Sequence, residues 1–323
     1  MIATAPGKLI LTGEYAVLDG APALVMAVDR RAVARRAKGG EGSPFLDAVA
    51  AELAARRGAA DPAAQAAREI AVDSSAFYDG AAKLGLGSSA AATTAAAARA
   101  LAEAGPLDHA EVLAVAQAAH AAAQAPRGAR GSGADVAAAV HGGLIVYEIS
   151  GGAPRIGRRA WPAGLLLVPF FTGQSADTPR LVAQVAAARA ARPAAVGAAL
   201  DEIAAASRAA CDALAGPPER AAAAVLEAFA RAGRAVDALA REAGADLVPG
   251  CVTAARAALA SLGGVVKTTG AGGGDLAVGL IPAAAGTSAA AGTDVARALI
   301  QVGCRPLRLS LDETGVDTRP DAG

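Results

Sequence analysis

A stretch of sixteen residues, Lys83–Ala98, constrains the fold of this chain more than any other. It reads KLGLGSSAAATTAAAA. Gly85 and Gly87 permit backbone turns that a side chain would forbid, and the following alanines predict a helix that Ser88 or Ser89 can cap. The unpaired N–H groups and positive dipole end of such a helix form an anion site, typically for phosphate. Taken alone, the stretch is better explained as an ordinary capped helix after a glycine turn.

Composition excludes several classes of protein. The 323 residues are 54% hydrophobic and 19% charged, which predicts a folded globular protein of one large or two ordinary domains. The formal net charge is zero without long runs of one sign, so we expect no nucleic-acid partner. We expect no membrane span and no signal peptide, because neither pattern is present. The three cysteines are widely spaced and form neither a disulfide framework nor a metal pattern, which fits a cytoplasmic location.

Two further glycine-rich segments lie far from the first, and each also contains a lysine. They are PGKLILTGEYAVL at 6–18 and KTTGAGGGD at 267–275. The chain has only four lysines among its 30 basic residues, and Lys8, Lys83 and Lys267 are the three beside these segments. A compact ammonium can meet a phosphate oxygen where a planar guanidinium does not fit. The pattern predicts sites at these three lysines, with chance placement as the alternative.

The order of predicted elements indicates an α+β fold. We expect strands at 9–11, 23–28, 32–36, 69–77, 144–149, 165–171, 265–268, 276–281 and 306–311. We expect helices at 44–57, 88–104, 108–124, 132–140, 178–191, 194–214, 218–243, 247–262 and 283–302. Apolar periodicity lapses at 150–162, where we place a domain boundary, and the tail after Asp312 is predicted to fray. Strands followed by helices without regular alternation favour α+β over a parallel α/β sheet.

The three segments together resemble the motifs of the GHMP kinases, in the same order and spacing, over nearly the whole chain. The GLGSSAA sequence is the most specific part of the resemblance. It implies a two-domain α+β fold with ATP in the cleft between the domains. Residues 1–155 would resemble domain 2 of ribosomal protein S5, and residues 160–315 would form a ferredoxin-like domain.

Within this family, the sequence is most similar to the phosphomevalonate kinases, through KLGLGSSAA, RGSGADVAA and KTTGAGGGD. The mevalonate kinases place a magnesium-binding glutamate eleven residues before the catalytic aspartate, whereas this chain has Gln124 there. The resemblance implies ATP and Mg²⁺ as cofactors and mevalonate 5-phosphate as the acceptor, in a monomer or homodimer. A phosphate acceptor is already anionic and needs cations rather than a general base. The alternatives are mevalonate kinase, another GHMP kinase and, in a different class, a non-catalytic sensor.

The resemblance also implies the roles of individual residues. Lys8 and Asp135 are expected to be catalytic, with the carboxylate of Asp135 orienting the acceptor or balancing Lys8. The ATP phosphates are expected to contact Lys83, Gly85, Leu86, Gly87, Ser88, Ser89 and Ala90, with Ser89 as a ligand of Mg²⁺. The acceptor is expected to contact Lys8, Arg127, Arg130, Ser132, Asp135, Thr172, Ser175, Thr178, Gly270, Ala271, Gly272 and Gly273. Structural readings compete with these roles: the arginines as loop charges, the hydroxyl residues as caps or turns, and Asp135 as a helix-start aspartate.

Overall fold

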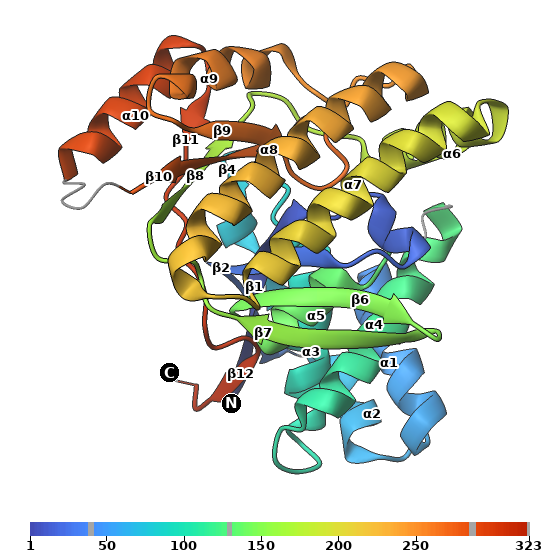
Figure 1. Cartoon of the computed structure of the whole chain (residues 1–323). Coiled ribbons are helices and arrows are strands. Elements are labelled where there is room, and N and C mark those ends of the chain that lie inside the picture. Colours follow the sequence, from blue (N-terminus) through green and yellow to red (C-terminus); the bar gives the residue numbers. More distant parts are fainter. Residues whose placement is uncertain (38–41, 128–130, 284–288, 322–323) are drawn as a thin grey trace.

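The computed structural model describes residues 1–37, 42–127, 131–283 and 289–321. Two larger antiparallel sheets, a two-stranded sheet and ten α-helices are present in this part of the chain, an α+β architecture as predicted. In Figure 1 the first sheet lies in the lower half of the molecule and the second sheet lies in the upper half. Both chain ends lie beside the first sheet.

The first sheet has the strand order β12-β1-β2-β6-β7, with β3 also paired to β2. Its strands are β1 (Ile2–Thr12), β2 (Ala23–Arg36), β3 (Ile70–Asp73), β6 (Leu144–Ser150), β7 (Ala153–Arg159) and β12 (Asp317–Arg319). The two strands predicted at 23–28 and 32–36 are one strand, whose register against β1 shifts between Pro6 and Gly7. Such a bulge bends a strand without ending it.

Two segments that we predicted to lack structure are strands of this first sheet. Residues 153–159, within the predicted domain boundary, form β7 and pair with β6 along its whole length. The tail after Asp312 does not fray throughout, because β12 pairs with β1. The C-terminal end of the chain therefore completes the sheet with which the chain begins.

Helices α1 to α5 pack beside the first sheet, with α3 and α5 against β1 and β2 and α4 against both helices (Figure 1). Their bounds are α1 (Pro44–Arg57), α2 (Pro62–Ala66), α3 (Ser88–Leu101), α4 (His109–Gln124) and α5 (Ala134–His141). Alanine runs favour these helices, and the Asp108 side chain caps α4 by accepting from the Ala110 N–H. A short hairpin of β4 (Tyr78–Asp79) and β5 (Ala82–Lys83) leads into α3.

The second sheet has the order β11-β8-β10-β9. Its strands are β8 (Leu165–Phe171), β9 (Val265–Thr268), β10 (Leu276–Pro282) and β11 (Arg305–Pro306). The helices of this half are α6 (Thr178–Ala191), α7 (Pro193–Ala213), α8 (Pro218–Ala243), α9 (Gly250–Ala260) and α10 (Ala289–Gln301). Helices α7 and α8 form a long antiparallel pair that contacts strands of both sheets. One hydrophobic core therefore runs from Leu9 and Leu24 of the first sheet to Phe229 of α8 and Leu276 of the second.

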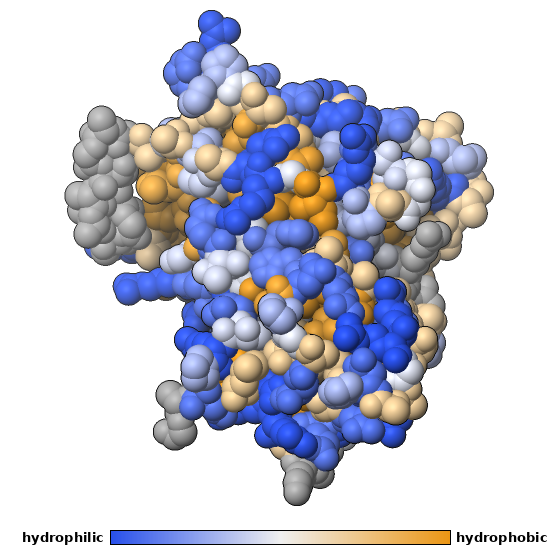
Figure 2. Space-filling view, turned by 90° about the horizontal axis from the view of Figure 1, so that it is seen from below, coloured by the Kyte–Doolittle hydropathy of each residue, from blue (hydrophilic) through white to orange (hydrophobic). Residues whose placement is uncertain are grey.

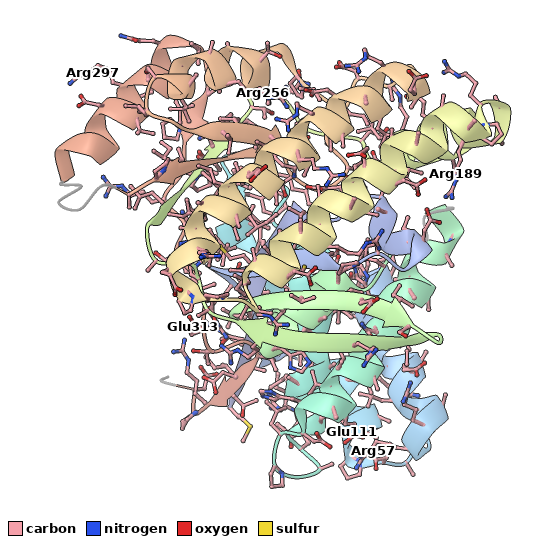
Figure 3. The ribbon with its side chains drawn as sticks, in the orientation of Figure 1. Arg57, Glu111, Arg189, Arg256, Arg297 and Glu313 are labelled. Carbon is pink, nitrogen blue, oxygen red and sulfur yellow. The ribbon has the colours of Figure 1, made fainter. Side chains whose placement is uncertain are left out.

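In the view of Figure 2, hydrophilic side chains surround smaller hydrophobic patches. Ion pairs join neighbouring helices, and Figure 3 labels one of them, in which Arg57 of α1 lies 2.6 Å from Glu111 of α4. Exposed pairs of this kind contribute little to stability. No helix in the described ranges is long and apolar enough to cross a bilayer.

Candidate active site

The site begins at the N-terminus of α3. Gly87 is the N-cap residue, with a φ of 76°, and no side chain caps the helix, so the predicted serine cap is wrong. Ser88 is buried, whereas the Ser89 hydroxyl borders a cavity. A helix end without a side-chain cap leaves its first N–H groups available to an anion. This arrangement retains the predicted anion site.

Strand β1 brings Lys8 to this helix end. The Lys8 N–H donates to the carbonyl oxygen of Leu86 at 2.8 Å, one residue after the register shift in β1. The Lys8 side chain passes Gly87 closely enough that a Cβ added there would lie 3.0 Å from its Cε. Gly87 is therefore needed both for its positive φ and for the path of the lysine.

A second helix, α5, directs its N-terminus toward the same cavity. Its N-cap residue is Gly133, with a φ of 80°, and the Ser132 hydroxyl accepts from the Ala134 N–H at 3.3 Å. Asp135 lies in the first turn, and its Oδ1 accepts from the Val136 N–H at 2.9 Å. The Ser132 carbonyl accepts from the Tyr147 hydroxyl at 2.6 Å, which fixes the loop before the helix. The helix dipole favours the Asp135 carboxylate at this position.

The third side of the cavity is the glycine-rich loop between β9 and β10. Hydrogen bonds hold this loop to the first sheet: the Tyr15 hydroxyl donates to the Ala271 carbonyl at 2.7 Å, and the Ile10 N–H donates to Thr269 Oγ1 at 3.2 Å. Tyr15 has a φ of 59°, which is uncommon for a residue with a bulky side chain. The loop is thus tied to the strand that carries Lys8.

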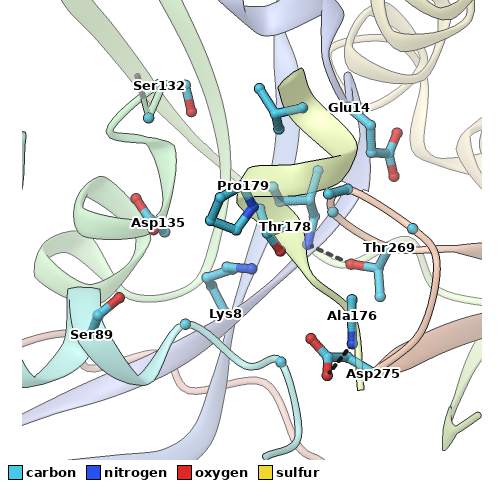
Figure 4. A pocket seen from close by; sticks show the side chains of 18 of the residues that line it. Lys8, Glu14, Ser89, Ser132, Asp135, Ala176, Thr178, Pro179, Thr269 and Asp275 are labelled. Carbon is cyan, nitrogen blue, oxygen red and sulfur yellow. Dashed lines mark hydrogen bonds between the residues drawn. The ribbon is translucent and has the colours of Figure 1, made fainter. Parts of the chain in front are cut away.

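A cavity of about 380 Å³ lies between these elements (Figure 4). In the close-up, the Lys8 side chain lies between Asp135 on one side and Asp275 on the other. The predicted residues that line the cavity are Lys8, Lys83, Gly85, Gly87, Ser89, Ser132, Asp135, Thr178, Gly270, Ala271 and Gly272. All three motifs of the sequence therefore border one cavity, although they are separated by up to about 260 residues in the chain.

Other predicted residues lie elsewhere. Six within the described part of the chain are outside the cavity lining: Leu86, Ser88, Ala90, Thr172, Ser175 and Gly273. The Thr172 hydroxyl instead donates to the Asp275 carbonyl at 3.1 Å, and Ser175 is exposed. Arg127 is the last residue of a 3-10 helix, Ala125–Arg127, and Arg130 lies outside the described residues. The predicted arginine contacts to phosphate therefore stay predictions.

Lys267, predicted as a third site lysine, is part of the core instead. Its side chain is 1% exposed and pairs with Glu14, while its ammonium also donates to the carbonyls of Leu11 and Thr268. Burial raises the pKa of Glu14 and lowers the pKa of Lys267, each opposed by the charge of its partner. The pair joins the turn after β1 to β9 beside the cavity, so Lys267 does not offer a free cation to it.

The cavity also contains residues that sequence reasoning did not select. Asp275 was left out, yet its Oδ1 accepts from the Ala176 N–H at 3.2 Å. Its side chain also crowds Gly85, where an added Cβ would lie 2.5 Å from the Asp275 Cβ and 2.7 Å from its Oδ2. His120, which is not among the predicted site residues, is 4% exposed and borders the cavity with Gln124. The sequence signal that could have identified His120 is its spacing of four residues from Gln124, because this spacing places both on one face of α4.

Electrostatics at the site centre on Lys8. Burial lowers its pKa, and the carboxylates of Asp135 and Asp275 oppose this effect. Burial also raises the pKa of Asp275, against the attraction of Lys83 and Lys8. Two lysines and two helix N-termini surround a space bordered by the carboxylates of Asp135 and Asp275 and by Glu14, which is paired with Lys267. This arrangement suits a polyanion with a bound cation.

The oxygen donors that line the cavity can hold Mg²⁺ only together with the oxygens of a bound phosphate ligand. Among the described residues, no three His, Cys, Asp or Glu side chains gather as a metal cage. Mg²⁺ commonly takes one or two protein ligands together with phosphate oxygens and water. The Ser89 hydroxyl and the carboxylates of Asp135 and Asp275 are the oxygen donors that border the cavity nearest the α3 N-terminus.

Comparisons with known proteins agree with this geometry. Residues 45–143 match the family model described as GHMP kinases N terminal domain. A Lin0012 protein from Listeria innocua has a TM-score of 0.79 at 18% identity, covering 98% of this chain and 99% of its own. No curated protein sequence matches the chain.

Two structures with bound ligands are also similar. Streptococcus pneumoniae phosphomevalonate kinase in complex with phosphomevalonate and AMPPNP has a TM-score of 0.75 at 18% identity, covering 96% of this chain and 99% of its own. The L. major mevalonate kinase in complex with R-mevalonate has a TM-score of 0.68 at 19% identity, covering 97% of this chain and 96% of its own. The chain therefore has the GHMP kinase fold, and the resemblance seen in the sequence is confirmed.

Proposed function

We propose that this chain, which has the GHMP kinase fold, is an ATP-dependent kinase that phosphorylates mevalonate 5-phosphate to mevalonate 5-diphosphate. The members of the GHMP kinase family are ATP-dependent kinases. The observation that carries the proposal is the single cavity at which the N-termini of α3 and α5 meet Lys8, Lys83 and Asp135. Two helix ends and two ammonium groups offset the charge of two phosphate groups brought close together.

The roles follow from where each group lies. The backbone N–H groups at the start of α3 bind the ATP phosphates, and Lys83 attracts them from the preceding hairpin. Lys8 stabilises charge on the phosphoryl group as it is transferred. Asp135 raises the pKa of Lys8 against the effect of burial, and it orients the acceptor. The Ser89 hydroxyl, together with the ATP phosphates, would hold Mg²⁺, which would supply further charge neutralisation.

A phosphate acceptor fits this site better than an alcohol. An acceptor phosphate oxygen is already anionic, so the transfer needs cations more than it needs a base. Gln124 borders the cavity and contributes no negative charge there. The Streptococcus pneumoniae kinase, similar in fold, is described in complex with phosphomevalonate and AMPPNP. Apolar side chains of Val17, Leu18 and Val182 on the cavity wall suit the hydrocarbon part of such an acceptor.

The experiment is ADP release from Mg-ATP with mevalonate 5-phosphate and mevalonate offered separately to the purified protein. We expect turnover with mevalonate 5-phosphate and at least a hundredfold lower kcat/KM with mevalonate, a difference of about 2.7 kcal/mol. Turnover with mevalonate alone would overturn the choice of acceptor and make Asp135 a general base. Binding of Mg-ATP without turnover of either acceptor would instead indicate another acceptor or a sensor.

A further inference from the structure

His120 forms a hydrogen bond with Ser89, which is the serine at the start of α3 that borders the cavity. Its Nε2 lies 3.1 Å from the Ser89 hydroxyl oxygen. The imidazole ring also stacks on Phe45 at the start of α1, with centroids 5.3 Å apart and an interplanar angle of 28°. Ser89, His120 and Phe45 all line the cavity. The imidazole is thus held by α1 and α4 while its polar edge faces α3.

The His120 imidazole, held in place by its stacking on Phe45, fixes the rotamer of the Ser89 hydroxyl through their hydrogen bond. A free hydroxyl samples three staggered positions, and only a correctly directed one can serve a phosphate oxygen or a cation. If Nε2 accepts the hydroxyl proton, the serine lone pairs remain for a cation. If Nε2–H donates, the hydroxyl proton remains for a phosphate oxygen. In both tautomers the bond selects one orientation of Ser89 before the nucleotide arrives.

Packing alone does not explain a histidine at this position. The side chain is 4% exposed, and burying an imidazole costs free energy that an apolar side chain stacked on Phe45 would avoid. The hydrogen bond to Ser89 offsets this cost. Position 120 therefore favours an aromatic side chain that can also form a hydrogen bond with Ser89.

We propose that His120 is a positioning residue that presets the Ser89 hydroxyl for the phosphates and metal of Mg-ATP. The proposal rests on the proposed function, because it assigns Mg-ATP to this cavity. It concerns nucleotide binding and phosphoryl transfer and makes no demand on which acceptor is used. The acceptor KM therefore serves as an internal control.

The first test is a double-mutant cycle on kcat/KM for Mg-ATP. His120→Phe keeps an aromatic ring against Phe45 and removes the bond to Ser89, so we expect about a tenfold loss, typical of one hydrogen bond. In a Ser89→Ala background the same substitution is expected to change kcat/KM less than twofold. His120→Gln, whose amide can reach the place of Nε2, is expected to restore most of the loss. His109→Phe, exposed on the same helix, is the matched control and should have no effect.

A merely structural role for His120 would give a different result. It predicts that His120→Phe lowers kcat/KM for Mg-ATP by the same factor in the wild type and in Ser89→Ala. It also predicts a lower melting temperature, and His120→Gln would not restore kcat/KM. Either equal losses, or unchanged kcat/KM in His120→Phe, would overturn the proposal.

The second test uses imidazole NMR and needs no turnover. The chain has three histidines, so the His120 resonance can be assigned by comparison with His120→Phe. We expect Mg-AMPPNP to shift the His120 Nε2 resonance in the wild type and not in Ser89→Ala. A shift seen without turnover of mevalonate 5-phosphate would overturn the proposed function alone. Turnover of that acceptor with no nucleotide-induced shift would overturn the inference alone, and failure of Mg-AMPPNP to bind would overturn both.

Discussion

Lys8 shows how a single residue depends on charges from distant parts of the chain. Burial lowers its pKa, and the carboxylates of Asp135 and Asp275 oppose this effect, which favours the ammonium that the proposed phosphoryl transfer needs. The lysine was recognisable from its glycine-rich segment. Asp275 was not, because only the folded chain brings position 275 beside position 8.

Replacing Asp275 by asparagine tests this dependence. The amide can still accept from Ala176 N–H, but the negative charge that raises the pKa of Lys8 is lost. With a lower pKa, Lys8 loses its proton at lower pH, so we expect the alkaline limb of the pH dependence of kcat/KM to move to lower pH. Asp19→Asn removes an exposed carboxylate paired with Arg189 and serves as the control. An alkaline limb that is the same in both variants and the wild type would contradict the account.

The buried Glu14–Lys267 pair should be costly to break and much less costly to remove. Lys267→Met leaves the Glu14 carboxylate buried without its partner, which typically costs about 3–5 kcal/mol. The double variant with Glu14→Leu leaves no unpaired charge, so we expect it to be more stable than the single variant. Urea unfolding monitored by circular dichroism measures both. Equal destabilisation in the two variants would mean that the pair acts only through packing.

At the scale of elements, local sequence signals predicted the helices better than the strands. Alanine runs and the Asp108 cap located α4, and the bounds of α1 and α8 were predicted correctly. Strand β7 was missed because APRIGRR, an edge strand with three arginines, a proline and a glycine, shows no apolar alternation. The serine cap of α3 was wrong because Gly87 takes the N-cap position, which frees the helix end for a ligand.

Gly87→Ala tests the helix end of α3. The φ of 76° strains an alanine, and its Cβ would crowd Lys8, so we expect a destabilisation of about 1 kcal/mol or more. We also expect weaker Mg-ATP binding, measured by titration calorimetry. Gly197→Ala is the matched control: it lies inside α7 with open space around its Cβ and should stabilise the chain by about 0.5–1 kcal/mol. Unchanged nucleotide affinity in Gly87→Ala would contradict the role given to this helix end.

At the scale of the whole molecule, hydrogen bonds join the first strand and the turn after it to the second half of the chain. Thr12 of β1 bonds to Ser207 of α7 at 2.9 Å, and the Tyr15 hydroxyl reaches Ala271. The sequence motifs identified the three segments of the site because each segment contains its own glycines and lysine. They could not indicate which side chains would meet, since those contacts join residues about 195 to 260 positions apart.

Truncation after Asp312 tests the coupling between the C-terminal tail and the site. The tail carries no residue of the cavity, but β12 pairs with β1, and the Arg31 guanidinium donates to the Gly315 carbonyl. We expect the truncated chain to have a lower melting temperature and a higher KM for Mg-ATP, because β1 also carries Lys8. Scanning calorimetry and ADP release measure these effects. A truncated chain with unchanged stability would mean that β12 contributes nothing to the sheet.

The most direct test of the central claim is ³¹P NMR of a reaction containing Mg-ATP, mevalonate 5-phosphate and the protein. Transfer to the acceptor phosphate predicts loss of the ATP γ-phosphorus signal and of the acceptor monoester signal. Two coupled diphosphate resonances other than those of ADP should appear in equal amount. A mixture that yields only ADP and inorganic phosphate, or that leaves the acceptor monoester signal unchanged while ATP is consumed, would contradict the account.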